Sequence, residues 1–270
     1  MLARQAIWKR KWALISLALW SGLLPTSSNA FADEAHGQTP GIYLWAWERR
    51  DDLRSLPPDV GVAYLAATIR VLGKRIVAVP RRQPLFVPPA TTLISVFRIE
   101  IPLRGQPKLD DNSVRQICNI ILRWNNYPHA SSVQIDFDAR QNQRDFYRRV
   151  LRRLRATLPE RCPIAITALA SWCLCDNWMK GLPVTEGIPM LFSMGPDNSN
   201  VLADIASAGK FSDALCQNSI GLSIDEPQVN DSVLRALRNR SAKERIYIFS
   251  SKQWSAELVQ RAIILAQSAR

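Results

Sequence analysis

Histidine is almost absent from this chain of 270 residues, which contains only His36 and His129. This count excludes a His-rich metal site. A Ser-His-Asp triad would require His129, but no nucleophile-elbow pattern is present in the sequence. A glycine-rich phosphate loop is also absent, which disfavours a nucleotide-binding, doubly wound sheet. We therefore expect no cofactor and no resident metal, and carboxylates become the candidates for chemistry.

Long apolar stretches are missing as well, except near the start of the chain. Residues 9–11 are basic, residues 12–24 form an apolar segment of about 13 residues, and residues 30–32 have the small-x-small pattern of a cleavage site. A membrane span needs about 20 residues. We expect residues 1–32 to be a cleaved signal peptide, with an uncleaved anchor as the alternative. Residues 33–270 would then form one periplasmic or secreted domain without a transmembrane segment.

Acidic residues are in the minority, with 23 Asp and Glu against 35 Lys and Arg, so the formal net charge is +12. Removal of the basic signal segment would lower this charge to about +8. A basic exported protein is suited to anionic glycans, lipid headgroups or the cell wall, whereas export separates it from nucleic acids. We interpret the arginine run over residues 148–155 as the solvent-facing side of a helix.

Cysteine is sparse, and all five cysteines follow the predicted signal peptide: Cys118, Cys162, Cys173, Cys175 and Cys216. In an oxidising compartment this number indicates one or two disulfides and at least one free thiol. The spacing does not assign the pairs. Cys173 and Cys175 are too close in sequence for a zinc knuckle.

Alternation of strands and helices dominates the rest of the sequence. Strand character covers residues 41–47, 61–66, 92–98, 131–138, 163–170, 187–192, 219–227 and 245–249, and helical periodicity covers residues 111–124, 145–158, 201–208, 232–240 and 256–267. This pattern predicts a (β/α)8 TIM-type barrel, with an open doubly wound sheet as the rival. A hairpin over residues 68–79 and a proline-rich segment replace early helices, so we expect irregular first and second crossovers.

The strand over residues 131–138 carries two carboxylates at its end. Period-two spacing places Gln134, Asp136 and Asp138 on one face, opposite an apolar set. In a barrel that face points inward, and the strand end lies at the mouth where active sites form. The alternative for Asp138 is capping of the helix that follows.

The other strand ends extend this candidate site. Alternation along residues 219–227 places Asp225 inward and Glu226 in the following loop. Arg98, at the end of its strand, would keep one of the inward carboxylates ionised. Structural ion pairing is the alternative for the charges, and core packing is the alternative for each tryptophan. The candidate catalytic residues are Asp136, Asp138, Asp225 and Glu226, and the candidate substrate-binding residues are Trp47, Glu48, Arg98, Trp172 and Met194.

Four segments carry a family resemblance: residues 43–49 (YLWAWER), 133–140 (VQIDFDAR), 166–173 (ITALASWC) and 189–192 (PMLF). Together they resemble a bacterial family known as domain of unknown function 3142, over most of residues 33–270. That family implies no activity. Residues 133–140 also resemble the acidic strand of chitinase-type glycoside hydrolases, which ends in a catalytic Glu, and Asp138 occupies that position here.

The leading hypothesis is an exported glycoside-hydrolase-like protein that acts on a polysaccharide. Asp138 would be the general acid, Asp136 its orienting partner, and Asp225 or Glu226 a carboxylate across the mouth. Trp47 and Trp172 would line the sugar cleft. The alternative is a non-catalytic barrel that binds a glycan or the cell envelope. A third hypothesis, a metal-dependent phosphodiesterase with oxygen ligands from Asp136 and Asp138, would require cation dependence.

Overall fold

The computed structural model describes residues 39–103, 107–125, 130–195, 198–237 and 245–269, so the predicted signal peptide and both histidines lie outside the described residues. The strands are β1 (Ile42–Ala46), β2 (Asp51–Asp52), β3 (Val60–Leu72), β4 (Arg75–Pro80), β5 (Leu85–Phe86), β6 (Leu93–Glu100), β7 (Ala130–Asp136), β8 (Ile164–Leu169), β9 (Glu186–Met190), β10 (Ser219–Ser223) and β11 (Arg245–Phe249). The helices are α1 (Asp111–Trp124), α2 (Arg144–Thr157), α3 (Ala170–Leu174), α4 (Asn198–Ala208), α5 (Pro227–Ala236) and α6 (Ala256–Ser268). Among these described helices, none is both long and apolar enough to span a membrane.

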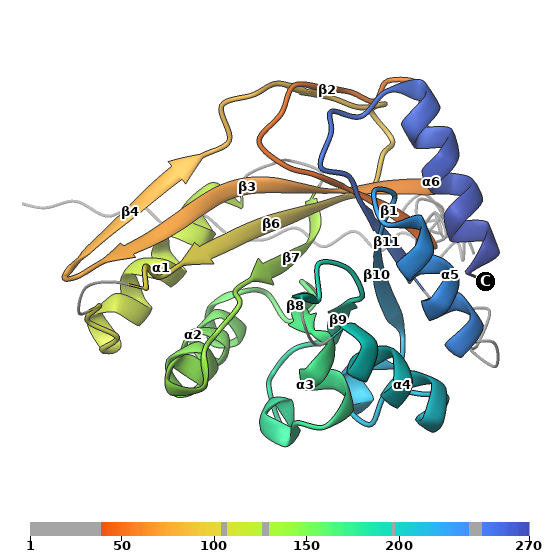
Figure 1. Cartoon of the computed structure of the whole chain (residues 1–270). Helices are drawn as coiled ribbons and strands as arrows, with labels where there is room; N and C mark the ends of the chain where they lie inside the picture. Colours follow the sequence, from red (N-terminus) through yellow and green to blue (C-terminus); the bar gives the residue numbers. More distant parts are fainter. Residues whose placement is uncertain (1–38, 104–106, 126–129, 196–197, 238–244, 270) are drawn as a thin grey trace, which may run out of the picture. The chain divides into compact units, whose positions relative to one another are not determined.

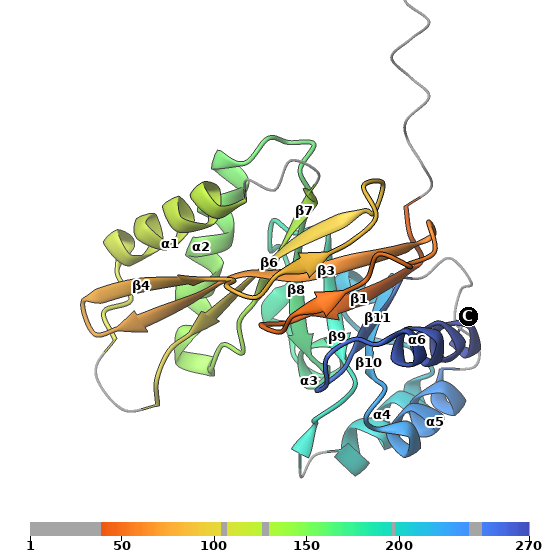
Figure 2. The same ribbon diagram turned by 90° about the horizontal axis from the view of Figure 1, so that it is seen from above.

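A closed barrel of eight parallel strands forms the centre of the described chain (Figure 1). The strands follow one another in the order β1, β3, β6, β7, β8, β9, β10 and β11, and β1 closes the ring by pairing in parallel with both β3 and β11. Helices α1 to α6 surround the strands (Figure 2). The predicted (β/α)8 TIM-type barrel is therefore confirmed.

The first two crossovers are irregular, as the sequence predicts. Between β1 and β3 the described chain contains the short strand β2, which pairs with β5. Strand β4 turns back against β3 at Gly73, whose φ of 61° suits a residue without Cβ. The sequence separates residues 61–66 from the hairpin, but the structure joins them in β3, with a change of register near Ala66. The hairpin extends beyond the barrel beside α1 (Figure 1).

The barrel interior and the layer beneath the helices form two separate apolar cores. Alternation along β7 assigns its residues to them, because Val133 and Ile135 join the outer core and Gln134 and Asp136 point inward. The inner core consists of Tyr43, Trp45, Ala63, Ile94, Val96, Ala165, Ile188 and Tyr247. The phase predicted for the acidic strand is therefore the one observed.

Gly221 on β10 makes room for an inner-core tryptophan. A Cβ at this position would lie 2.7 Å from Cη2 of Trp45, which is only 2% exposed. We expect Gly221→Ala to lower the free energy of unfolding by about 1–3 kcal/mol, because the packed indole must move. Gly187→Ala is the matched control, since its nearest neighbour would lie at 3.6 Å. Equal denaturation midpoints for the two variants would contradict this packing.

The arginines over residues 148–155 are exposed or half-exposed on α2, as predicted, and some arginines of this helix also contact neighbouring elements. Arg144 pairs with Asp176, and Arg149 pairs with Asp111 at the start of α1. Arg148 donates to the carbonyl oxygens of Trp178 and Lys180. Arg144, Arg148 and Arg149 thus connect α2 to its neighbours, while Arg152 and Arg153 are exposed to solvent.

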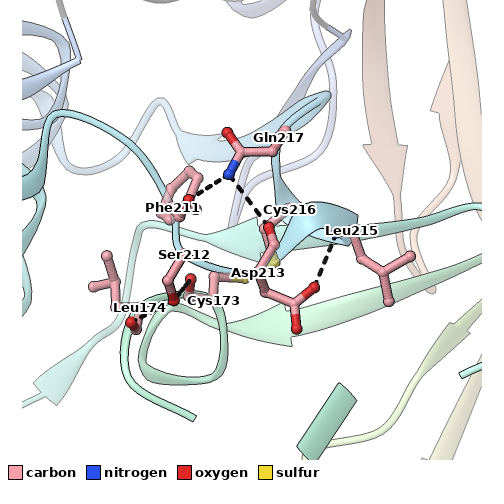
Figure 3. Close-up of a disulfide and its surroundings, with 8 residues drawn as sticks. All are labelled: Cys173, Leu174, Phe211, Ser212, Asp213, Leu215, Cys216 and Gln217. Carbon is pink, nitrogen blue, oxygen red and sulfur yellow. Dashed lines mark hydrogen bonds between the residues drawn. A yellow bond between two sulfur atoms is a disulfide. The ribbon is translucent and has the colours of Figure 1, made fainter. Parts of the chain in front are cut away.

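One disulfide connects two of the loops around the barrel (Figure 3). Cys173 in α3 pairs with Cys216, 43 residues later and just before β10. Ser212 reinforces the link, because its Oγ donates to the carbonyl oxygen of Cys173 at 3.1 Å. Cys118, Cys162 and Cys175 are free. The prediction of one or two disulfides with a free thiol is confirmed.

A buried polar cluster lies at the amino-terminal ends of β9, β10 and β11. Glu186 is 6% exposed and accepts hydrogen bonds from the Tyr247 hydroxyl at 3.1 Å, from Arg245 Nε at 3.1 Å and from Ser219. Tyr43 stacks on Tyr247, and burial raises the pKa of Tyr43 to about 12. These charges therefore satisfy one another at this end of the barrel.

Candidate active site

A cleft of about 450 Å³ opens at the carboxyl ends of the barrel strands. Its walls come from β1, β6, β7, β8, β9 and β11 and from the loops that follow them. The lining residues are Trp45, Trp47, Arg98, Asp136, Asp138, Thr167, Leu169, Ala170, Ser171, Met190, Phe192, Ser193, Met194, Val201 and Phe249. Five of the nine residues predicted from the sequence lie in this wall: Trp47, Arg98, Asp136, Asp138 and Met194.

Asp136 is the buried member of the acidic pair, with 6% of its surface exposed. Its Oδ1 accepts a hydrogen bond of 2.7 Å from the Thr167 hydroxyl, and its Oδ2 lies 3.7 Å from Arg98 Nη1. Burial and the charge of Asp138 raise the pKa of Asp136 to about 6, although Arg98 and Thr167 oppose this shift. Asp136 therefore retains its proton up to about pH 6, well above the range in which an exposed aspartate ionises.

Asp138 stands at the rim of the cleft, where it is exposed to solvent. The surrounding walls still desolvate its carboxylate enough to raise its pKa, and Arg98 opposes this effect. Helix capping does not explain Asp138, because the residue at the cap of the following turn is Arg140. Since the charge of Asp138 raises the pKa of Asp136, the two carboxyl groups titrate as a coupled pair.

Aromatic side chains form the wall opposite the acidic pair. Phe192 and Phe249 stack with ring centroids 5.2 Å apart, and Trp47 meets Phe249 edge-on at 6.5 Å. The guanidinium of Arg98 lies 5.8 Å from the ring centroid of Trp47. Trp45 lies deeper and packs within the inner core. Flat apolar faces beside carboxylates are suited to the binding of sugar rings.

The loop after β1 places Trp47 through contacts with the segment after β4. Arg81 has 8% of its side chain exposed, pairs with Asp51, and donates to the carbonyl oxygens of Ala46 and Trp47. Glu48 accepts hydrogen bonds from the backbone nitrogens of Arg82 at 2.9 Å and Gln83 at 3.0 Å. Glu48 therefore anchors this loop and does not line the cleft.

Trp172 also lies outside the cleft wall. It is 2% exposed and packs edge-on against Trp178, with ring centroids 4.8 Å apart. Strand β8 ends at Leu169 and α3 begins at Ala170, so Trp172 lies within a helix and not at a strand end. Its side chain belongs to the outer core, and its ring faces are covered by protein.

Asp225 and Glu226 bind neighbouring loops instead of facing the acidic pair. Asp225 Oδ2 accepts a hydrogen bond of 2.6 Å from the Ser251 backbone nitrogen. Glu226 Oε1 accepts from the Ser193 backbone nitrogen at 3.0 Å and from its hydroxyl at 3.2 Å. Ser193, in the cleft wall, has a φ of 52°, a conformation that costs a non-glycine residue free energy. Glu226 thus holds a strained part of the wall.

We expect Glu226→Ala to lower the free energy of unfolding by about 1 kcal/mol, because Ser193 loses its acceptor while keeping its strained backbone. Glu226→Gln is the matched control, since its amide oxygen still accepts the hydrogen bond from Ser193. Its cost should be less than half that of the alanine variant in urea denaturation. Equal costs for Ala and Gln would contradict the anchoring role.

The cleft also contains residues that sequence reasoning did not select, notably Thr167, Met190, Phe192 and Phe249. The sequence offered a signal for two of them. Thr167 lies on the inward-facing side of the predicted fifth strand, and Phe249 is the last residue of the predicted eighth strand. Within the described ranges, no group of three or more His, Cys, Asp or Glu side chains is placed to hold a metal ion.

No protein-family model and no curated protein sequence matches the chain. The resemblance to domain of unknown function 3142 therefore stays a prediction. Among solved structures, a protein assigned as chitinase A of Streptomyces coelicolor aligns with a TM-score of 0.55 at 10% identity, covering 85% of this chain and 98% of that one. This likeness extends the resemblance to chitinase-type proteins from one strand to the fold of the barrel.

Two further structures align less well. The spore cortex-lytic enzyme SleL of Bacillus cereus has a TM-score of 0.40 at 12% identity, covering 78% of this chain and 50% of that one. The chitinase domain of the spore coat protein CotE of Clostridium difficile has a TM-score of 0.38 at 13% identity, covering 83% and 68%. The first alignment shows that this chain shares its barrel fold with that protein.

Proposed function

We propose that this chain is an exported glycoside-hydrolase-like protein that binds and cleaves a polysaccharide in the cleft at the barrel mouth. The observation that supports it most strongly is the coupled pair Asp136 and Asp138, set opposite the aromatic wall of Trp47, Phe192 and Phe249. The disulfide between Cys173 and Cys216 supports export, because disulfides persist in oxidising compartments.

Asp138 donates its proton to the glycosidic oxygen as the bond from that oxygen to the anomeric carbon breaks, since it is the more exposed of the two carboxyl groups. Water then adds to the anomeric carbon, and the proton that it loses returns to the acidic pair. Asp136 retains a proton up to about pH 6 and shares the pair's charge with Asp138. Arg98 stabilises the negative charge that remains on the pair after the proton is given up. Asp225 and Glu226 serve as positioning residues for the rim loops and not as the carboxylate across the mouth.

The second candidate function is a non-catalytic glycan-binding barrel. It is favoured by one observation: the carboxylates in the cleft wall are two aspartates at the end of one strand, β7, whereas Asp225 and Glu226 are hydrogen-bonded elsewhere. A glycosidase needs two carboxyl groups, one on each side of the scissile bond, or a different group that replaces one of them. A binding protein needs only the cleft and its aromatic wall.

Incubation of the purified protein with chitin and with peptidoglycan tests these functions. Co-sedimentation measures binding, and the appearance of new reducing ends measures cleavage. Binding with release is the result that we expect. Binding without release favours the glycan-binding barrel. Release that a chelator abolishes favours the metal-dependent hypothesis, and the absence of binding to either polymer contradicts both glycan functions.

A further inference from the structure

A second cavity of about 240 Å³ adjoins the acidic pair on the β6 and β7 side of the mouth. Its lining residues are Arg98, Ile99, Glu100, Ile101, Leu103, Asp136, Phe137, Asp138, Arg140 and Gln143. It shares Arg98, Asp136 and Asp138 with the larger cleft. The acidic pair therefore stands at the junction of two cavities, and a linear glycan that passes Asp138 enters both.

The two cavities differ in chemistry. Aromatic and aliphatic side chains such as Phe192, Phe249 and Met190 line the larger cleft. Among the described residues that line the smaller cavity, the one aromatic residue is Phe137, whose side chain belongs to the outer core, and the charged residues include Arg98, Glu100 and Arg140. A sugar residue in the smaller cavity meets charged groups on the protein rather than a stacking surface.

Arg140 is the cation of this cavity that is least engaged. Its Nη2 makes two long hydrogen bonds of 3.4 Å, to the carbonyl oxygens of Ile101 and Pro102, and within the described residues it forms no ion pair with a carboxylate. Its backbone nitrogen donates to Gln143 Oε1 at 3.0 Å, a contact that does not involve the guanidinium. The guanidinium is therefore exposed in the cavity and has no carboxylate partner among the described residues.

Two of the three acidic side chains that line this cavity, Glu100 and Asp136, are engaged by other groups, whereas Asp138 forms no ion pair within the described residues. Glu100 Oε2 accepts from Arg70 Nε at 2.9 Å, and its Oε1 lies 3.3 Å from Arg98 Nε. Asp136 carries a proton for part of its population near neutral pH, since its pKa is raised to about 6. A planar guanidinium without such a partner is suited to a carboxylate, which it binds through two parallel hydrogen bonds.

We propose that the smaller cavity is a subsite for a sugar residue that bears a carboxylate, with Arg140 as the residue that determines this specificity. The substrate is then an acidic polysaccharide, bound with its anionic residue beside Arg140 and its neighbouring residue against the aromatic wall. This inference rests on the proposed glycan function of the cleft. The net positive charge of the chain, which stays at about +8 after removal of the predicted signal peptide, favours the approach of such a polymer.

The test compares two tetrasaccharides that differ by carboxymethyl groups, which carry the negative charge: chitotetraose and its 6-O-carboxymethyl derivative. Calorimetric titration uses the full chain carrying Asp138→Asn, so that turnover does not consume the ligand. We expect the carboxymethylated ligand to bind about 10-fold more tightly at low salt, because one charge-assisted hydrogen-bond pair separates the two ligands. Adding Arg140→Gln should remove this preference and leave the affinity for chitotetraose within about 2-fold.

Arg115→Gln is the matched control. Arg115 is an exposed arginine of α1 that donates to Asn112 and lines neither cavity, so its loss should leave the preference intact. Equal affinities for the two ligands before the Arg140 change would overturn the subsite. So would a loss of affinity for both ligands alike after it.

Binding and cleavage separate this inference from the proposed function. A charge preference that depends on Arg140, in a protein that releases no reducing ends, supports the subsite and contradicts the hydrolase. Release from neutral and carboxymethylated chitin at equal rates, unchanged by Arg140→Gln in the otherwise unmodified chain, supports the hydrolase and contradicts the subsite.

Discussion

Replacement of Asp138 by Asn should reduce the release of reducing ends by about 10²–10⁴-fold, the range that general acid catalysis contributes. The amide has nearly the same shape as the carboxyl group but carries no acidic proton, so the leaving oxygen must depart without protonation. Asp138 is exposed in the cleft and caps no helix, so the fold should tolerate the change. Binding of the polysaccharide should remain within a few-fold of the wild type, and the rate constant kcat should carry the loss.

Asp59→Asn is the control for this experiment. Asp59 is exposed between Pro58 and Val60 and lines neither of the two cavities that meet at the acidic pair. Its replacement removes one negative charge and should leave the rate unchanged. If Asp138→Asn cleaved at the rate of Asp59→Asn, Asp138 would not be the proton donor.

Replacement of Asp136 by Asn should stabilise the protein at alkaline pH by as much as about 3 kcal/mol. The pKa of Asp136 rises from an ordinary 3.8 to about 6 in the folded protein, mainly through burial. The folded state therefore binds the proton more tightly than the unfolded state. Its stabilising effect is complete below pH 3.8 and is lost as the pH rises through 6, at 1.36 kcal/mol per pH unit.

Asparagine avoids this loss because it does not ionise, and its amide oxygen can still accept the hydrogen bond from Thr167. Urea unfolding at pH 4 and pH 8 measures the effect. The two proteins should have similar free energies of unfolding at pH 4, and the variant should be the more stable at pH 8. Equal stability at both pH values would show that Asp136 ionises without cost. A gain in stability with a loss of release is the trade-off expected of a functional carboxylate.

The barrel could be predicted from the sequence because each strand and helix carries its own periodicity. Helix α1 begins and ends where the pattern over residues 111–124 places it, and β11 matches residues 245–249. The inward phase of Asp136 followed from alternation alone, since one face of β7 must be apolar to pack beneath the helices. The hairpin of β3 and β4 was visible through its turn at Gly73, but the continuity of β3 was not, because a change of register near Ala66 interrupts its alternation.

The candidate site could be predicted only in part, because side-chain partners come from distant segments. Trp172 was placed at a strand end, yet β8 stops at Leu169 and a short helix turns the indole into the outer core. Glu226 has a carboxylate that could act in catalysis, but this carboxylate accepts a hydrogen bond from the backbone nitrogen of Ser193, whose backbone is strained. Neither contact leaves a local pattern in the sequence.

The smaller cavity shows the same limit. Arg140 lies two residues after Asp138, where it resembles any exposed arginine of a charged loop. Its significance depends on Glu100, which belongs to a different strand and is already engaged by Arg70. Only the assembled mouth of the barrel shows which arginine lacks a carboxylate partner within the described residues.

The most direct test of the central claim is a time course of reducing-end release by the wild type and by the Asp136→Asn/Asp138→Asn double variant, on one polysaccharide that both proteins bind. Our account predicts continuous release by the wild type and no release above background by the double variant, with both proteins bound to the polymer to a similar extent. Release by the double variant at the wild-type rate would contradict it.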